Sequence, residues 1–171
     1  KKNGGQTLSY AWTQTSGPSL TMTGATTATP SFTAPTLAIV AADEVLVFEL
    51  SVNDGFSGAV DYVAITVSAP GNTPPTATAG SDETVASGAS VTLDGASSSA
   101  NDAGQALTYR WSQTSGPSVA LTDATSVSPS FTAPTLAIGA ADEVLNFELE
   151  VDDGFATATD SVTITVAAPD N

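Results

Sequence analysis

A long internal repeat constrains this chain more than any other feature of its sequence. The segment LSYAWTQTSGPS at residues 8–19 returns as LTYRWSQTSGPS at residues 107–118, an offset of 99 residues. The same offset aligns residues 1–70 with residues 100–169 without a gap, and about 45 of the 70 pairs are identical. A unit of about 100 residues is too long for a solenoid repeat and matches one β-sandwich domain. The sequence therefore predicts two domains in tandem.

Paired prolines mark the junction between the two copies. The sequence GNTPP at residues 71–75 predicts a short, extended and stiff linker. We therefore expect a partial repeat over residues 1–70 and a complete repeat over residues 76–171. Copy one has no equivalent of residues 74–99, in which strands are predicted around residues 76–79 and 90–93. The first domain is expected to lack its opening strands.

Two explanations account for the missing strands: a neighbouring chain donates them, or the chain is a piece of a longer array. Each chain holds one copy of the opening strands but two copies of everything that follows. Identical chains therefore cannot complete every sandwich by donation. We expect a piece of a longer array whose true ends lie elsewhere.

Apolar residues alternate with polar ones along most of the chain, which predicts strands with one buried face. Helical periodicity is almost absent; a single turn is predicted in LAIVAADE and LAIGAADE. The turn sequences SGPS, TAPT and DDGF or NDGF separate the strands. We predict an all-β fold of two tandem immunoglobulin-like antiparallel β-sandwich domains. The residues predicted to face the core are Val91, Leu93, Leu107, Tyr109, Trp111, Leu145, Phe147, Leu149, Val151, Val162, Ile164 and Val166 in copy two, and Leu8, Tyr10, Trp12, Leu46, Phe48, Leu50, Val52, Val63, Ile65 and Val67 in copy one.

The composition removes most enzyme chemistry. The chain has no cysteine and no histidine, which excludes disulfides, thiolate nucleophiles, Cys-type zinc sites and Ser-His-Asp triads. Carboxylates alone can hydrolyse glycosides, but Glu148 and Glu150 lie on the outer face of one strand, without a pocket to raise a pKa. We therefore expect no enzyme. The net charge of -15 disfavours nucleic acid and anionic lipid surfaces, and no apolar run is long enough to cross a membrane.

The acidic side chains favour cations as ligands, calcium above all. In the predicted topology the loop before the tryptophan strand and the DDG turn project toward one pole of copy two, where the linker also arrives. Their oxygens could surround one Ca²⁺, although D-G and N-D-G turns also need Asp or Asn for backbone reasons alone. No EF-hand spacing is present. The candidate ligands are Asn72, Asn101, Asp102, Asp152, Asp153 and Asp160 in copy two, and Asn3, Asn53, Asp54 and Asp61 in copy one.

Four aromatic residues each allow two interpretations. Trp12 and Trp111 could stack on sugars, but both fall in step with inward-facing Leu and Tyr residues, which predicts a place in the core. Phe56 and Phe155 follow the DG turns and either cap the core or lie at a domain tip.

One charged pair is predicted from the differences between the copies. Arg110 and Glu150 in copy two are replaced by Ala11 and Ser51 in copy one, so the opposite charges appear and disappear together. We predict a cross-strand ion pair between Arg110 and either Glu150 or Glu148.

Four segments of copy two resemble the polycystic-kidney-disease (PKD) type immunoglobulin-like repeat: NTPPTATAGSDETVASGASVTLDGASSS, LTYRWSQTSGP, FELEVDDG and DSVTITV. The tryptophan strand reads W-x-Q-x-x-G instead of W-D-F-G-D-G. It is thus similar to the subgroup shared with receptor-for-egg-jelly-like and bacterial cell-surface repeats. The resemblance implies an extracellular, non-enzymatic module, found in tandem on cell-surface proteins or appended to secreted hydrolases.

We therefore expect a structural spacer or adhesion segment of a cell-surface or secreted protein, stiffened by Ca²⁺ between domains. Its expected partners are neighbouring repeats of the same polypeptide, together with a surface protein or polysaccharide; nucleic acid and membrane insertion are not expected. The alternative is a polysaccharide- or protein-binding accessory module of a secreted hydrolase. That alternative requires an exposed aromatic or polar platform.

Overall fold

The computed structural model describes residues 7–170, and the chain divides into two compact units, Lys1–Gly71 and Asn72–Asn171. Strands are the only regular elements among the described residues, which confirms the all-β class. Within that range no helix has the length and hydrophobicity to cross a membrane. The helical turn predicted near residues 38–41 is instead a simple turn, in which the Ala41 N–H donates to the Ala38 carbonyl at 3.2 Å.

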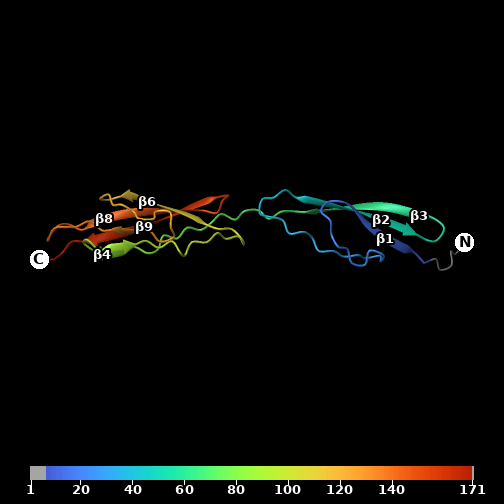
Figure 1. Cartoon of the computed structure of the whole chain (residues 1–171), viewed down its shortest axis with the longest axis horizontal. Coiled ribbons are helices and arrows are strands. Elements are labelled where there is room, and N and C mark those ends of the chain that lie inside the picture. The colour runs from blue at the N-terminus through green and yellow to red at the C-terminus, as the bar shows by residue number, and fades with distance from the viewer. Residues whose placement is uncertain (1–6, 171) are drawn as a thin grey trace. The chain divides into compact units, whose positions relative to one another are not determined.

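Unit 2 (residues 72–171) is a sandwich of two sheets (Figure 1). A four-stranded sheet has the order β4 (Glu83–Ala86), β9 (Thr157–Ala167), β8 (Glu143–Asp152) and β6 (Thr108–Ser115). A two-stranded sheet pairs β5 (Ser90–Thr92) with β7 (Ser130–Thr132). The predicted immunoglobulin-like sandwich is confirmed, and the strand expected at residues 90–93 is β5. Residues 76–79, also predicted as a strand, form only one bridge, between Thr76 and Ser99.

One strand pair departs from the antiparallel pattern. β8 pairs antiparallel with both β6 and β9, whereas β4 runs parallel to β9, with Val85 opposite Val166. β9 leaves the hairpin at residues 153–156, and the segment that leads to β4 starts beside the same hairpin, where Asn72 bonds to Asp153. Two strands that leave the same end of a sheet side by side must run in the same direction.

The core of unit 2 lies between its two sheets. The Phe131 and Phe147 rings, one from each sheet, have centroids 4.9 Å apart. Trp111 is 3% exposed, so its predicted place in the core is confirmed. The side chains that pack between the sheets are Val91, Leu93, Trp111, Phe131, Leu145, Phe147, Leu149, Val151, Val162, Ile164 and Val166.

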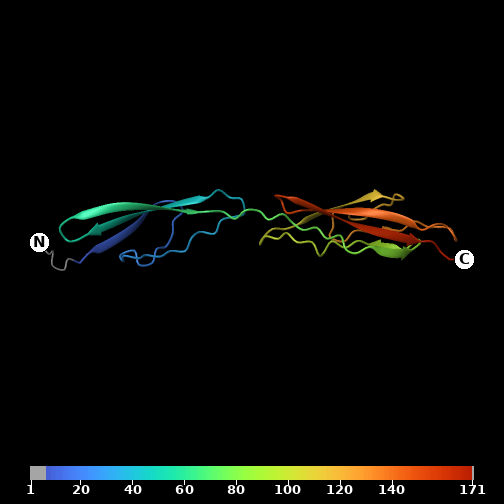
Figure 2. The same ribbon diagram turned by 180° about the vertical axis from the view of Figure 1, so that it is seen from behind.

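Unit 1 (residues 1–71) has one regular sheet within its described residues, 7–71 (Figure 2). Its antiparallel order is β1 (Ser9–Ser16), β2 (Glu44–Asn53) and β3 (Gly58–Val67). These strands align with β6, β8 and β9 of unit 2, and no strand equivalent to β4 or β5 precedes them in the described range. Within residues 7–71 the first sandwich thus has no opening strands, as expected.

Burial in unit 1 is correspondingly incomplete. Leu46 and Phe48 are buried, but Val63 is 40% exposed and Ile65 is 36% exposed. The aligned residues in unit 2, Val162 and Ile164, are 3% and 2% exposed. The same apolar faces are therefore present in both units, but only unit 2 covers them fully.

The remaining side-chain predictions have clear outcomes. The Arg110 Nη2 atom lies 3.0 Å from Glu150 Oε1, which confirms the predicted cross-strand pair. Phe56 and Phe155 are 87% and 56% exposed, so both lie at domain tips rather than capping the core. Trp12 is half buried, because residues 7–71 contain no counterpart of the opening segment that helps to enclose Trp111 in unit 2.

The W-x-Q-x-x-G motif has a structural role in both units. The Gln113 amide donates to the Ser115 and Pro117 carbonyls, and its oxygen accepts the Val119 N–H at 3.0 Å. Gln14 makes the same three hydrogen bonds in unit 1. The motif glycines have positive φ, and a Cβ atom on Gly17 would lie 2.6 Å from the Val45 carbonyl oxygen. The motif thus fixes the loop that follows the tryptophan strand.

Candidate functional site

Polar side chains at one end of unit 2 hold the segment that leads into it. We call the group Asn101, Asp102, Gln105 and Asp153 the linker clamp, because each of these side chains bonds to residues 72–76. Their positions follow from two loops that the fold brings to one pole: the loop before β6 and the hairpin between β8 and β9.

Asp153 is the buried member of the linker clamp, with 5% of its surface exposed. Its Oδ1 atom accepts the N–H groups of Phe155 at 2.8 Å and Ala156 at 2.7 Å, which closes the hairpin turn. Its Oδ2 atom accepts the Asn72 amide at 3.2 Å. Burial acts to raise the pKa of this carboxyl, but the three hydrogen bonds outweigh burial and hold the pKa below its ordinary value of 3.8.

Asn72 is bound on both sides of its amide. While its nitrogen donates to Asp153, its oxygen accepts the Gln105 amide at 2.6 Å. Gln105 was not among the predicted site residues, although its recurrence as Gln6 in copy one is a signal that sequence reasoning passed over. The two hydrogen bonds from Gln105 to Asn72 and from Asn72 to Asp153 therefore connect the first residue of unit 2 to two separate loops.

The next residues of the linker are held through their backbone. The Asp102 carboxylate accepts the Thr73 N–H at 2.6 Å. The Asn101 amide donates to the Pro74 carbonyl at 2.7 Å and to the Thr76 hydroxyl at 3.0 Å. Asn101 has a φ of 66°, a left-handed conformation that Asn tolerates better than most residues. Pro75 is buried whereas Pro74 is exposed, so only the second of the paired prolines packs against unit 2.

The other predicted ligands of unit 2 lie outside this group. Asp152 accepts the Gly154 N–H at 2.7 Å within the hairpin turn. Asp160 accepts the Ala79 N–H at 2.8 Å and so holds the opening segment further along β9. The structure thus brings Asn72 and Asp153 into contact, and Asn101 and Asp102 bind the linker residues that follow Asn72. Asp152 and Asp160 bind other backbone groups.

The predicted ligands of unit 1 that the structure describes bond to backbone N–H groups close to them in the sequence. Asn53 accepts the Gly55 N–H, and Asp61 accepts the Tyr62 N–H. Asp54 accepts the N–H groups of Ser57 and Phe56, which lower its pKa below the ordinary 3.8. Asn3 lies outside the described residues. Asp54 therefore repeats the turn geometry of Asp153 without an Asn72 equivalent among residues 7–71.

The oxygen atoms at these positions are largely committed to hydrogen bonds. Within residues 7–170 no three carboxylates gather around one point that could hold a metal ion. Within the linker clamp, the Gln105 Oε1 atom is buried and has no hydrogen-bond partner in that range. Calcium prefers six to eight oxygen ligands. As it stands, the arrangement holds the first residues of unit 2 by hydrogen bonds.

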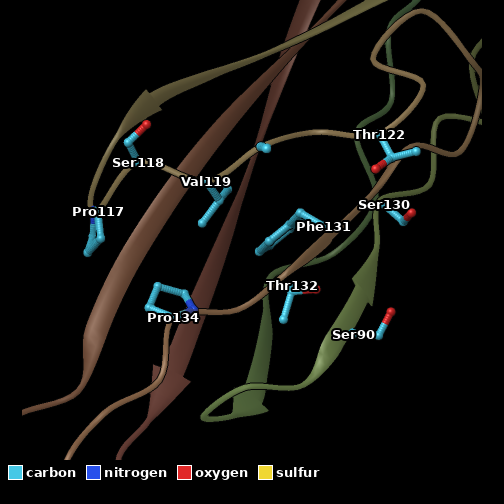
Figure 3. A pocket seen from close by; sticks show the side chains of 10 residues that line it. Ser90, Pro117, Ser118, Val119, Thr122, Ser130, Phe131, Thr132 and Pro134 are labelled. Atoms are coloured by element: carbon cyan, nitrogen blue, oxygen red, sulfur yellow. The ribbon is translucent and has the colours of Figure 1, made fainter.

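A shallow hollow of about 520 Å³ lies on another side of unit 2 (Figure 3). The Phe131 ring extends toward Val119 in its middle, and the hydroxyl groups of Ser118, Ser130 and Ser90 lie toward its rim. Phe131 is only 3% exposed, so it offers no open ring face. The hollow therefore presents mainly hydroxyl groups and proline rings.

Comparisons with known proteins identify the domain type. A family model described as K319L-like, PKD domain, matches residues 1–67 and 79–166. No curated protein sequence matches the chain. An endo-fucoidan hydrolase from glycoside hydrolase family 107 is similar over 93% of this chain and 24% of its own, at 21% identity and a TM-score of 0.36. The protocadherin GammaB4 extracellular domain is similar over 95% of this chain and 28% of its own, at 17% identity and a TM-score of 0.40.

A tandem arrangement also occurs among these structures. A chimeric titin Z1Z2 tandem is similar over 95% of this chain and 84% of its own, at 13% identity and a TM-score of 0.34. The chain spans only about a quarter of the length of the hydrolase that it resembles, which is 24% of that chain. The family model, in contrast, extends over most of both units. The chain therefore belongs to the family of K319L-like PKD domains.

Proposed function

We propose that this chain is a non-enzymatic, extracellular spacer of a cell-surface or secreted protein, in which each repeat fixes the direction of the linker that enters it. The observation that carries the proposal is the linker clamp. Four side chains hold three consecutive linker residues, Asn72, Thr73 and Pro74, to unit 2. A linker bound in this way transmits orientation between neighbouring repeats instead of acting as a flexible tether.

Two further features support a spacer. Near-identical copies add length without needing distinct sites, and the two units share the same loop-fixing motif at Gln14 and Gln113. The chain also has an excess of acidic residues, 18 against 3 basic, which discourages edge-to-edge pairing of exposed strands. On the W-x-Q-x-x-G motif we assign both copies to that subgroup of PKD-type repeats, whose partners would be neighbouring repeats of the same polypeptide.

The linker clamp can be tested by backbone dynamics in the whole chain. Backbone ¹⁵N relaxation should give Thr73 an order parameter of about 0.8 or more, and Asp102→Ala should lower it below about 0.6. Glu148→Ala removes the same charge from an exposed position on β8 and is the matched control, which should leave Thr73 rigid. A mobile Thr73 in the unaltered chain would refute the proposal.

Calcium stiffening remains a prediction at the same residues. The Asp153 carboxylate already accepts three hydrogen bonds, so a bound Ca²⁺ would have to displace the Asn72 amide and recruit the spare Gln105 oxygen. Thermal unfolding of the chain in millimolar Ca²⁺ and again in EDTA tests this. Ligand at about 100 times its Kd should add about 2.7 kcal/mol to the stability of unit 2. Identical melting curves would leave a metal-free linker clamp.

A second candidate function is binding of a polysaccharide or a protein by an accessory module, favoured by the hydroxyl-lined hollow of unit 2. Unit 2 would then be retained on insoluble chitin, cellulose or collagen, and Ser118→Leu, which replaces a rim hydroxyl, would release it. A spacer should remain in the supernatant with all three polymers. Exposed Asp142→Ala, outside the hollow, is the control.

A further inference from the structure

Unit 1 exposes an apolar face that its own described residues do not cover. A hollow of about 180 Å³ opens there between the sheet and the segment around Phe32. Val63 and Ile65, both on β3, are 40% and 36% exposed at this face. The residues that line the hollow are Trp12, Met22, Pro30, Phe32, Phe48, Val63 and Ile65.

Unit 2 shows what covers the aligned face. Its counterparts of Phe32, Val63 and Ile65 are Phe131, Val162 and Ile164, which are at most 3% exposed. They pack in one cluster with Val91 and Leu93, which come from the opening segment, residues 72–99. Unit 1 has no such segment within residues 7–71.

The backbone contacts of the opening segment map onto unit 1 in the same way. In unit 2, β4 pairs parallel with residues 164–167 of β9, and β5 pairs with β7. Of the equivalent residues 65–68, residues 65–67 belong to β3 and lie on the edge of the unit 1 sheet, because within residues 7–71 β2 is the one sheet neighbour of β3. An edge strand beside an apolar hollow can accept a further strand through main-chain hydrogen bonds and side-chain burial together.

Polar receptors also recur on unit 1. Asp160, which accepts the Ala79 N–H of the opening segment, aligns with the exposed Asp61. Asp153, which accepts the Asn72 amide, aligns with Asp54. Residues that align with the receptors for the first part of the opening segment, residues 72–79, are therefore present on unit 1.

We infer that this face of unit 1 is a docking surface for the opening segment of a further repeat, a polypeptide with the chemistry of residues 72–99. That segment adds one strand parallel to β3 and places two apolar side chains, equivalent to Val91 and Leu93, into the hollow. The inference rests on the comparison of the two units and does not depend on the spacer role.

A second copy of this chain is a poor donor. Its only opening segment is already bound in its own unit 2, where β4, β5, Val91 and Leu93 are paired and buried. Giving up that segment would open one sandwich to close another, with no net gain in burial. The occupant is therefore a further opening segment and not one borrowed from an identical chain.

The test adds that segment to the whole chain. Since residue 99 precedes residue 100, which aligns with residue 1, residues 72–99 can be joined directly ahead of Lys1 in register. Hydrogen exchange followed by mass spectrometry should then show exchange of Gly58–Val67 slowed by about tenfold or more, with Thr157–Ala167 unchanged. A synthetic peptide of residues 72–99, added at near-millimolar concentration in high salt to screen the acidic charges, should give the same protection more weakly.

The control carries Val91→Asp and Leu93→Asp in the added segment alone, leaving unit 2 intact. It should lose the protection, because the charged side chains cannot enter the apolar hollow. Equal protection with the altered segment, or no protection with either, would overturn the inference. So would protection of Gly58–Val67 in the unaltered chain that rises with protein concentration together with a doubled mass, since a second copy would then cover the face.

Discussion

The two units test how far sequence identity determines burial, because they carry the same core residues with different coverings. Ile65 and Ile164 occupy aligned positions on β3 and β9, yet they are 36% and 2% exposed. Trp12 and Trp111 differ in the same way, the first half buried and the second 3% exposed. An apolar strand face therefore indicates where a core can form. Whether that core is shielded from solvent depends on a different segment of the chain, which in unit 2 is residues 72–99.

The largest difference between the units should appear when the core is truncated. Leu149 is fully buried, so Leu149→Ala should cost unit 2 about 3 to 5 kcal/mol of unfolding free energy. The aligned Leu50 is only partly buried, and Leu50→Ala should cost unit 1 about 1 to 2 kcal/mol. Each unit has one tryptophan, so urea titration followed by the two indole N–H signals in NMR reports both units separately. Equal costs would break the comparison.

One difference between the units lies in the backbone, and here a substitution in unit 1 should be stabilising. Val40 has a φ of 50°, a left-handed conformation that is costly for a β-branched residue, and copy two has Gly139 at this position with a φ of 71°. Val40→Gly should stabilise unit 1 by about 0.5 to 1 kcal/mol, and Gly139→Val should destabilise unit 2 by a similar amount. The same urea titration measures both. The account of this turn would be wrong if Val40→Gly lowered the stability of unit 1.

Acid should lower the stability of both units, but the carboxylates responsible have different hydrogen-bond partners in the two units. The Asp54 and Asp153 pKa values are lowered from 3.8 on folding, so each carboxylate contributes stability that is present above pH 3.8 and is lost as the pH falls through the folded pKa. Asn72→Ala removes a hydrogen bond from Asp153 alone and should raise the acid midpoint of unit 2 while that of unit 1 stays fixed. Acid titration of the two indole signals measures this, and a shift in both units would contradict it.

The smallest expected effect is that of the surface ion pair found only in unit 2. Arg110 is 65% exposed in its side chain, so its coupling to Glu150 should be about 0.2 to 1 kcal/mol in a double-mutant cycle of Arg110→Ala and Glu150→Ser. These substitutions reproduce Ala11 and Ser51 of unit 1. Installing the pair there by Ala11→Arg and Ser51→Glu should give a coupling of the same size. A coupling above about 2 kcal/mol would show that the pair is more than a solvated surface contact.

Much of the fold follows from local patterns that the sequence displays. Alternation predicts β2, β3, β8 and β9 and places Trp111 in the core, and the repeat predicts two units. The strand β4 was missed because Glu83–Ala86 has a single half-buried residue, Val85, and pairs with a strand about 80 residues away. Such a short edge strand depends on its partner, and its own pattern carries little signal.

Three members of the linker clamp were named from the sequence, but as candidate calcium ligands and not as groups that bind the linker. Turn chemistry and topology brought Asn101, Asp102 and Asp153 to one pole, where the structure has them. Their partners are backbone N–H and carbonyl groups of the linker together with the Gln105 amide, and such pairings depend on the exact path of residues 72–76. Side-chain type cannot distinguish a carboxylate that binds a linker from one that binds a cation.

The most direct test of the central claim compares hydrogen exchange in the aligned strands β3 and β9 of the unaltered chain. The two strands have the same register against their neighbours β2 and β8, so the covering segment is the main difference between them. The account predicts that amides of Thr157–Ala167 exchange about tenfold or more slowly than their counterparts in Gly58–Val67, most clearly at residues 164–167, where β4 pairs. Equal protection along the two strands would contradict it.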